Sequence, residues 1–383
     1  MKIAVIGAGF YGATLARLVA EAGHEVMVYE AESSIGGNAK SHFDPRIGTH
    51  VSDYGAHIFH TNSDRVWDFV SRFATFNGYR HYVKGWTGTK MVDLPFNLSL
   101  FSQVLGITTP AEAHTYFNRL ASLQKESYRH DVSTVEGWCL ANIGPDLYET
   151  VVKDYTEKQW GRACSDLPAS IIQRLPIRFT YDNTYFHNAK YQGMPLNGYS
   201  NIMEQILNHP SIVVVKDADV GLTNLSLIEK NVDRVFFSGP VDRLFSYEEG
   251  VLSYRGLRFE DVLVPKSASQ GAPVINNVGR VVPGIARSGS TRTIEHSLFY
   301  PEARTENQTR TLLTREYPAQ WAPGDRPYYP IRDEQNLALH ERYTKLLDHH
   351  HPKVRLGGRL GTYMYLDIDQ AVGQAMSHAK EFQ

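Results

Sequence analysis

A mixed α/β fold with a parallel sheet, a helical insertion and an antiparallel sheet is the architecture that the sequence predicts. Three observations lead to it: a βαβ pattern opens the chain, helical spacing of apolar residues dominates from about 100 to 160, and short strand-like runs follow from about 230 to 320. The 383 residues, 42% of them hydrophobic, are enough for two or three folding units with buried cores.

The βαβ pattern begins with a short apolar strand at Lys2–Ile6. A glycine turn over residues 7–12 leads into a helix at Tyr11–Ala22, whose apolar residues recur at helical spacing. A second strand at Val26–Tyr29 ends at Glu30. The two strands of such a unit are expected to run parallel, with a right-handed crossover between them.

The turn Gly7-x-Gly9-x-x-Gly12 is suited to a bound pyrophosphate. Gly7 allows the tight turn, Gly9 lets the backbone approach a phosphate, and Gly12 lets the helix pack against the sheet. The helix N-terminus offers free N–H groups to the phosphates, and Glu30 is placed to accept hydrogen bonds from a ribose. The sequence therefore predicts a Rossmann-like dinucleotide-binding unit.

Two further segments favour FAD over NAD as the dinucleotide. Glu30 is followed six residues later by Gly36-Gly37, which is similar to the extended signature of FAD oxidoreductases of the amine-oxidase type. Near the C-terminus, the stretch 358–367 precedes a helix expected over about Asp369–Phe382. The N-terminus of that helix would point at the flavin ring, where its dipole favours negative charge on a reduced flavin.

The remaining elements divide between helices and short strands. Helices are expected at Pro110–Leu123 and across Val135–Trp160. Strands are expected at Val213–Val215, which should lie parallel beside the N-terminal unit, and at Val235–Phe237, Val251–Tyr254, Thr311–Thr314 and Val354–Leu356. We expect a discontinuous FAD-binding domain (1–80, about 195–235 and 335–383), a helical domain (100–172) and an antiparallel sheet domain lining the substrate cleft (81–99, about 173–194 and 236–334).

Composition argues against several classes of protein. The formal net charge of −2 gives no electrostatic basis for binding nucleic acid. Cys139 and Cys164 have neither zinc-ligand nor disulfide-framework spacing, and they fit a reducing compartment. The sequence shows no secretory signal and no apolar run of membrane-spanning length, so we expect a cytoplasmic protein without a metal site.

Aromatic and basic residues gather in several stretches beyond the nucleotide unit. Tyr54–Thr61, Tyr155–Gly161 and Thr291–His296 combine hydroxyl-bearing aromatics, histidines and arginines. Aromatic rings can stack on a base, and arginine forks can bind a diphosphate. Each residue alone also has a structural explanation, but together they suit a sugar nucleotide beside a flavin. Further tyrosines of the same kind are Tyr185, Tyr191, Tyr317, Tyr328 and Tyr329.

These stretches resemble the UDP-galactopyranose mutase family along essentially the whole chain. The most specific segments are GAHIFHT (55–61), YTEKQWG (155–161), LPIRF (175–179), YQGMP (191–195), TRTIEH (291–296) and GRLGTYMYLD (358–367). The resemblance implies an isomerase that interconverts UDP-galactopyranose and UDP-galactofuranose, with N5 of reduced FAD as the nucleophile at the anomeric carbon. It also implies a UDP-sugar substrate and a reductant such as NAD(P)H or a flavin reductase, and it leaves a homodimer open.

The resemblance also assigns roles to individual residues. Arg174 and Arg292 would be catalytic residues that hold the diphosphate, with Arg174 on a mobile loop, and His57 would lie near flavin N5. The other substrate-binding residues would be Tyr155, Thr156, Trp160, Tyr185, His81, Arg255, Tyr317 and Tyr365. The cofactor-binding residues would be Gly7, Gly9, Phe10, Gly12, Glu30, Gly37, Asn38, His57, Ile58, Arg359, Leu366, Asp367 and Ile368.

Several positions depart from the family's usual pattern. Asp154 stands where glycine is common, His81 where asparagine is frequent, and Ser290 where an aromatic residue usually precedes Thr-Arg. The stretch 278–290 is also longer than usual. These departures keep UDP-N-acetylgalactosamine and other nucleotide-linked pyranoses open as substrates. An amine-oxidase-like oxidoreductase and a non-catalytic nucleotide-binding protein are the alternative functions.

Overall fold

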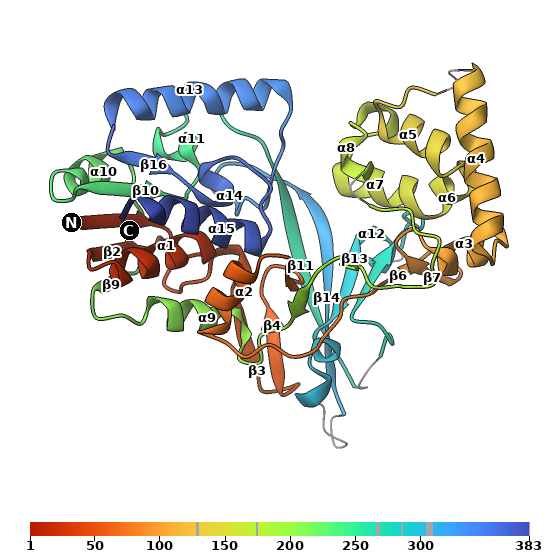
Figure 1. Ribbon diagram of the computed structural model, residues 1–383, viewed down its shortest axis with the longest axis horizontal. Helices are drawn as coiled ribbons and strands as arrows, with labels where there is room; N and C mark the ends of the chain where they lie inside the picture. Colours follow the sequence, from red (N-terminus) through yellow and green to blue (C-terminus); the bar gives the residue numbers. More distant parts are fainter. Residues whose placement is uncertain (128–129, 174, 266–268, 285, 304–308, 383) are drawn as a thin grey trace.

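The computed structural model describes residues 1–127, 130–173, 175–265, 269–284, 286–303 and 309–382. Both termini lie in a unit built on the parallel sheet, and a helical cluster lies at the opposite end of the molecule (Figure 1). The long strands of an antiparallel sheet connect these two ends (Figure 1). The mixed α/β architecture that the sequence predicts is therefore confirmed.

The parallel sheet has the strand order β16–β10–β1–β2–β9, and all its pairs are parallel. Its strands are β1 (Lys2–Ile6), β2 (Glu25–Tyr29), β9 (Ile212–Val215), β10 (Arg234–Phe237) and β16 (Val354–Leu356). Every one of these strands was expected from the sequence to within one residue of its bounds. The structure places β10 beside β1 in this sheet.

Helices cover both faces of the parallel sheet. Ile3 and Val5 pack in the same core cluster as residues of α1 (Phe10–Glu21), α9 (Gly198–Leu207) and α15 (Ile368–Ala379). Ala4 and Ile6 alternate to the other face. They pack there with residues of α10 (Leu222–Glu229), α11 (Val241–Leu244) and α13 (Glu334–His350). The predicted final helix is confirmed, and a 3₁₀ turn at Lys380–Phe382 extends it.

The second sheet has the order β15–β11–β14–β13–β12–β6–β7 and is antiparallel except where β12 meets β6. Its strands are β6 (Val83–Trp86), β7 (Met91–Leu94), β11 (Tyr254–Val264), β12 (Val274–Asn277), β13 (Arg292–Glu295), β14 (Thr311–Gln320) and β15 (Tyr329–Pro330). The strand predicted over Val251–Tyr254 is wrong except for its last residue. The backbone amides there donate to side chains and not to a neighbouring strand: Leu252 N donates to Asp242 and Ser253 N to Asn336, each over 2.9 Å.

The helical spacing predicted across Val135–Trp160 is divided among several helices in the structure. The chain turns at Gly144, whose φ is +83° and whose added Cβ would lie 2.2 Å from the Tyr116 hydroxyl. A π-helical turn at Tyr148–Val152 then leads directly into α7 (Lys153–Trp160). The other helices of the cluster are α3 (Leu98–Leu105), α4 (Pro110–Ser127), α5 (Val135–Asn142), α6 (Pro145–Leu147) and α8 (Ser170–Gln173).

Short elements join these units. The strand pairs are β3 (Ser41–Asp44) with β4 (Thr49–Ser52), and β5 (Phe59–Thr61) with β8 (Tyr191–Gly193). The short helices are α2 (Asp64–Ser71), α12 (Ala286–Gly289) and α14 (Gly358–Gly361). Among the helices of the described part of the chain, none has the length and apolarity that crossing a membrane requires.

Candidate active site

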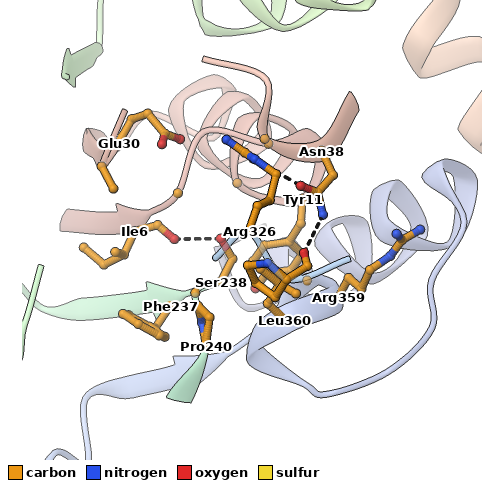
Figure 2. A pocket seen from close by; sticks show the side chains of 18 of the residues that line it. Ile6, Tyr11, Glu30, Asn38, Phe237, Ser238, Pro240, Arg326, Arg359 and Leu360 are labelled. Atoms are coloured by element: carbon orange, nitrogen blue, oxygen red, sulfur yellow. Dashed lines mark hydrogen bonds between the residues drawn. The ribbon is translucent and has the colours of Figure 1, made fainter. Parts of the chain in front are cut away.

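A cavity of about 520 Å³ opens where β1, β2 and β10 end (Figure 2). Gly7 and Gly9 follow β1, Glu30 follows β2, and Ser238 follows β10, and all four line the cavity. Crevices at the carboxyl ends of parallel strands are the usual ligand sites of such sheets. The volume falls in the ordinary range of small-molecule sites.

The glycine turn has the close packing that the sequence predicts. Gly7 adopts a φ of +102°, and its amide donates to Tyr29 O over 2.7 Å. A Cβ on Gly12 would lie 1.9 Å from Gly7 O, so helix and strand touch there. A Cβ on Gly9 would meet nothing within 4 Å, because this glycine faces open space in the cavity.

Glu30 is held at the end of β2 by backbone amides. Its Oε2 accepts from Ala8 N over 2.8 Å, and its Oε1 accepts from Glu32 N over 3.0 Å. Burial raises the pKa of this carboxyl, and the two amides oppose that rise. The carboxyl is therefore fixed beside the glycine turn, where it can accept further hydrogen bonds.

The C-terminal segment forms another wall of the cavity. Arg359 Nε donates to Leu366 O over 3.1 Å, which fixes the loop between α14 and α15. Leu366, Asp367 and Ile368 line the cavity where α15 begins. The predicted cofactor residues that line the cavity are Gly7, Gly9, Phe10, Gly12, Glu30, Gly37, Asn38, His57, Arg359, Leu366, Asp367 and Ile368. Ile58 is not among the lining residues and packs against the hydrophobic core.

Arg292 is the centre of a second polar cluster. It stands opposite Glu316 in the β13–β14 register, and its Nε lies 3.4 Å from Glu316 Oε1. Its Nη2 donates to the Tyr155 hydroxyl over 3.2 Å. Burial opposes the charge of Arg292, but Glu316 and Tyr155 outweigh burial and hold its pKa well above the ordinary value. A charged guanidinium is thus fixed between strand β14 and helix α7.

Helix α7 is fastened to the strands around Arg292 by Lys158, which sequence reasoning missed. Lys158 Nζ donates to three backbone carbonyls, those of Asn277 (2.8 Å), Gly279 (3.3 Å) and Ser290 (3.2 Å). Burial lowers the pKa of Lys158 to about 8. The helix that carries Tyr155, Thr156 and Trp160 is therefore held at a fixed distance from β13. Arg255 adds to this by donating to Gln159 O.

The tyrosines predicted to bind phosphate lie in different places. Tyr317 follows Glu316 on β14, so its side chain lies on the opposite face from the Arg292–Glu316 pair. There it donates to Glu260 over 2.7 Å. The structure instead places Tyr329 near Glu316, the partner of Arg292. The Tyr329 ring stacks on Tyr365 with the ring centroids 5.6 Å apart, and its pKa is raised first by burial and then by the negative charge of Glu316.

His81 lies in an aromatic cluster with Tyr79, Tyr185 and Phe186. Its Nδ1 shares a hydrogen bond with the Tyr79 hydroxyl over 2.9 Å, and its backbone carbonyl accepts from Tyr185 N over 2.7 Å. Its ring stacks on Phe186, which also stacks on His60 with centroids 3.7 Å apart. His60 belonged to the GAHIFHT segment but was not predicted as a site residue.

His57 lines the cavity and is also close enough to Arg292 for the charge of that arginine to act on it. Its Nε2 is fully buried with no hydrogen-bond partner among the described residues. Burial, together with the positive charges of Arg359 and Arg292, lowers the pKa of His57 to about 4. The imidazole is therefore neutral at neutral pH. Arg174, the other predicted catalytic arginine, lies outside the described residues.

Buried histidines predict a steep acid destabilisation. Burial lowers the pKa of both His81 and His296 to about 3, against about 6.5 in the unfolded chain. Between these pH values the unfolded state binds more protons, so stability is present above pH 6.5 and is lost as pH falls toward 3. The two groups together give a slope of about 3 kcal/mol per pH unit.

This slope can be measured as the urea unfolding free energy of the protein from pH 7 to pH 4. His81→Asn should lower the slope by the contribution of about one proton, because one fewer group takes up a proton on unfolding. His349→Gln, at the exposed end of α13, should leave the slope unchanged. Equal slopes in all three proteins would contradict burial of a neutral His81.

Comparisons with known proteins agree with this geometry. A family model described as UDP-galactopyranose mutase matches residues 150–365, and a model described as an NAD(P)-binding Rossmann-like domain matches residues 5–73. The probable UDP-galactopyranose mutase of Klebsiella pneumoniae is 38% identical, over 100% of this chain and 94% of its own length. The dTDP-fucopyranose mutase of Escherichia coli is 34% identical, over 99% of this chain and 97% of its own length.

Solved structures are similar in fold. The crystal structure of reduced UDP-galactopyranose mutase superposes with a TM-score of 0.73 at 15% identity and covers 99% of this chain and 93% of that chain. Putrescine oxidase bound to putrescine gives 0.57 at 10% identity, over 100% and 99% of the two chains. At these identities the likeness shows the fold alone. Since the first family model spans more than half of the chain, and relatives more than 30% identical cover nearly all of it, the chain belongs to the UDP-galactopyranose mutase family.

Proposed function

We propose that the protein interconverts UDP-galactopyranose and UDP-galactofuranose with reduced FAD as its cofactor. The observation that carries the proposal is the partly buried Arg292–Glu316–Tyr155 cluster, whose positive charge acts on His57, a residue that lines the dinucleotide-type cavity. A fixed arginine suits a diphosphate leaving group, which gains negative charge as the bond to the sugar breaks. An enzyme that oxidises simple amines has no need of such a group.

The residues of the cavity fit FAD. Gly9 leaves space for a diphosphate, Glu30 offers a fixed carboxyl to a ribose, and the unpartnered Nε2 of His57 is suited to a polar ring edge. When bound, reduced FAD would supply the nucleophile that attacks the anomeric carbon. Its reductant, NAD(P)H or a flavin reductase, is part of the same proposal.

The protein's own residues bind and orient the nucleotide sugar. Arg292 would hold the diphosphate, together with Arg174 from the segment outside the described residues. Trp160 and Tyr155 would pack on the sugar and nucleoside, and Lys158 would keep their helix in register with Arg292. Neutral His57 would donate or accept a hydrogen bond at the reacting centre without adding charge.

The phosphate tyrosines need one revision. Tyr329 and Tyr365 stack beside Arg359 on the side of the sheet that carries Arg292, so we propose this pair as the hydroxyl donors to phosphate. Tyr317 is bound to Glu260 on the other face. Tyr185, whose amide is bound to the His81 carbonyl, stays in the proposed set.

The similarity to dTDP-fucopyranose mutase supports a second candidate substrate. Because that relative is 34% identical over 99% of this chain, thymidine-linked sugars belong in a substrate panel with UDP-galactose and UDP-N-acetylgalactosamine. Asp154 and the stretch 278–290 bear on this choice, since Arg280 lies 3.7 Å from Asp154 beside α7. We propose UDP-galactose as the preferred substrate of the panel.

An anaerobic spectrum separates this proposal from an oxidoreductase. Oxidised, FAD-loaded protein is mixed with excess UDP-galactopyranose, and the flavin absorbance is followed. We expect no bleaching, because the proposed reaction leaves no electrons on the flavin. Stoichiometric bleaching by the sugar nucleotide would instead identify an oxidoreductase related to the amine oxidases.

A further inference from the structure

Arg326 enters the dinucleotide cavity from the antiparallel sheet. It lies in the segment 321–328 between β14 and β15, yet its side chain lines the cavity together with Gly9, Gly37 and Asn38 (Figure 2). The segment is braced internally, because Trp321 Nε1 donates to Asp325 O and Ala322 N to Asp325 Oδ2, both over 3.0 Å. Hydrogen bonds within the segment therefore hold the backbone that carries Arg326.

Three groups fix the Arg326 guanidinium. Nη2 donates to Glu32 Oε1, and Nη1 donates to Asn38 Oδ1 over 3.1 Å. Its Cζ lies 4.0 Å from the centre of the Tyr54 ring. The side chain keeps 23% of its exposure, so a planar set of donors remains open toward the cavity.

The position of the guanidinium relates it to the glycine turn. A Cβ on Gly37 would lie 3.7 Å from Gly9 Cα, so the Gly37–Asn38 segment touches the turn. Asn38 binds both Arg326 and the residue after it, because its Nδ2 donates to Pro327 O over 3.0 Å. The positive charge of Arg326 also acts on Glu30, whose pKa burial raises and Arg326 lowers.

The charges of the cavity explain why a cation is needed there. Its acidic lining residues are Glu30, Glu32, Asp219, Asp242, Asp325 and Asp367. Of the lining arginines, Arg243 pairs with Asp219 over 2.6 Å and Arg359 is bound to Leu366 O. A diphosphate would bring further negative charge among these acids, and Arg326 is the lining arginine that contacts Asn38 beside the turn.

We propose that Arg326 is a cofactor-binding residue whose guanidinium donates to a phosphate oxygen of the bound dinucleotide. Glu32 and Asn38 orient the guanidinium for this contact, and the segment 321–328 is thereby fastened over the cofactor. The inference rests on the proposed binding of FAD. The competing explanation is that Arg326 and Glu32 form only a tether between the two sheets.

Opposite effects of two substitutions separate these explanations. The Kd for FAD is measured by flavin fluorescence on serial dilution of the purified holoenzyme. Arg326→Ala should weaken FAD about ten- to a hundredfold and reduce the salt dependence of binding, with Arg326→Lys in between. Glu32→Gln keeps the shape of the side chain but removes a negative charge, so FAD affinity should stay the same or rise.

A tether alone would make Arg326→Ala and Glu32→Gln weaken FAD equally, and this result would overturn the proposal. Arg342→Ala is the matched control, because Arg342 forms a surface pair with Glu249 at 3.4 Å. If the wild-type protein binds FAD and Arg326→Ala binds it as tightly, this inference fails by itself. If the wild-type protein binds no FAD, the proposed function fails first.

Discussion

Replacing Arg292 with alanine is expected to lower turnover about a hundred- to a thousandfold while FAD stays bound. The guanidinium is held by Tyr155 and Glu316 and is not among the residues that line the cavity proposed for the cofactor. In the proposed mechanism, loss of this guanidinium would remove paired donors from the leaving diphosphate. Turnover is measured with UDP-galactofuranose, and bound FAD from the flavin-to-protein absorbance ratio.

The alanine variant also leaves Glu316, which is 2% exposed, without its charged partner. Breaking a buried pair costs about 3–5 kcal/mol, so lower thermal stability is expected as well. Arg292→Lys keeps a positive charge but loses the bidentate fork, so it should fold and still turn over slowly. Arg315→Ala serves as the control, because Arg315 pairs with Glu260 on the opposite face of the same sheet. Turnover of folded Arg292→Lys within about threefold of wild type would contradict the proposed role.

Gly12→Ala is expected to prevent the dinucleotide-binding unit from folding, whereas the Gly9→Ala variant should fold normally and no longer bind FAD. A methyl on Gly12 would lie 1.9 Å from Gly7 O, and that peptide is held by the bond from Gly7 N to Tyr29 O. Such overpacking costs about 3 kcal/mol or more, which exceeds the gain of about 1 kcal/mol from replacing a helical glycine.

At Gly9 the same methyl meets no protein atom within 4 Å, and the backbone (φ −81°, ψ −174°) accepts alanine. The methyl would instead occupy the space proposed for the diphosphate. Circular dichroism and thermal melts report folding, and flavin fluorescence reports FAD affinity. Wild-type FAD affinity in Gly9→Ala would show that the cofactor does not pass over this turn.

The nucleotide unit could be predicted because its signals are local. Gly7, Gly12 and Glu30 lie within one βαβ unit, where spacing alone determines which residues meet. Ser238 was within reach of the same argument, since it directly follows β10, which was predicted as a strand. The sequence did not identify β10 as a neighbour of β1, so the residue was missed.

The substrate side of the site was harder to predict, because the alternation of side chains along a strand decides which residues share a face with Arg292. The sequence predicted a strand only over Thr311–Thr314, but β14 continues to Gln320. The extra residues put Glu316 beside Arg292 and turn Tyr317 to the other face. The strand predicted from the sequence ended before these residues, so it could not show on which face of the sheet Tyr317 lies.

Contacts between distant segments had no local signal at all. Arg326 meets Glu32 across 294 positions of sequence, and Lys158 meets Ser290 across 132. Arg326 belongs to none of the motifs described above, and Lys158 lies in the YTEKQWG segment, whose pattern does not show what the lysine contacts. Their roles depend on how the two sheets and the helical cluster are arranged, which only the folded chain defines.

The central claim is that the protein moves the sugar between two ring forms, with its cofactor reduced and no net redox change. The direct measurement reduces the FAD-loaded protein with dithionite under anaerobic conditions, adds UDP-galactofuranose, and separates the products by chromatography. We predict that UDP-galactopyranose forms over many turnovers without further consumption of reductant, and that oxidised protein is inactive. Conversion by oxidised protein alone, or no conversion by the reduced protein, would contradict the claim.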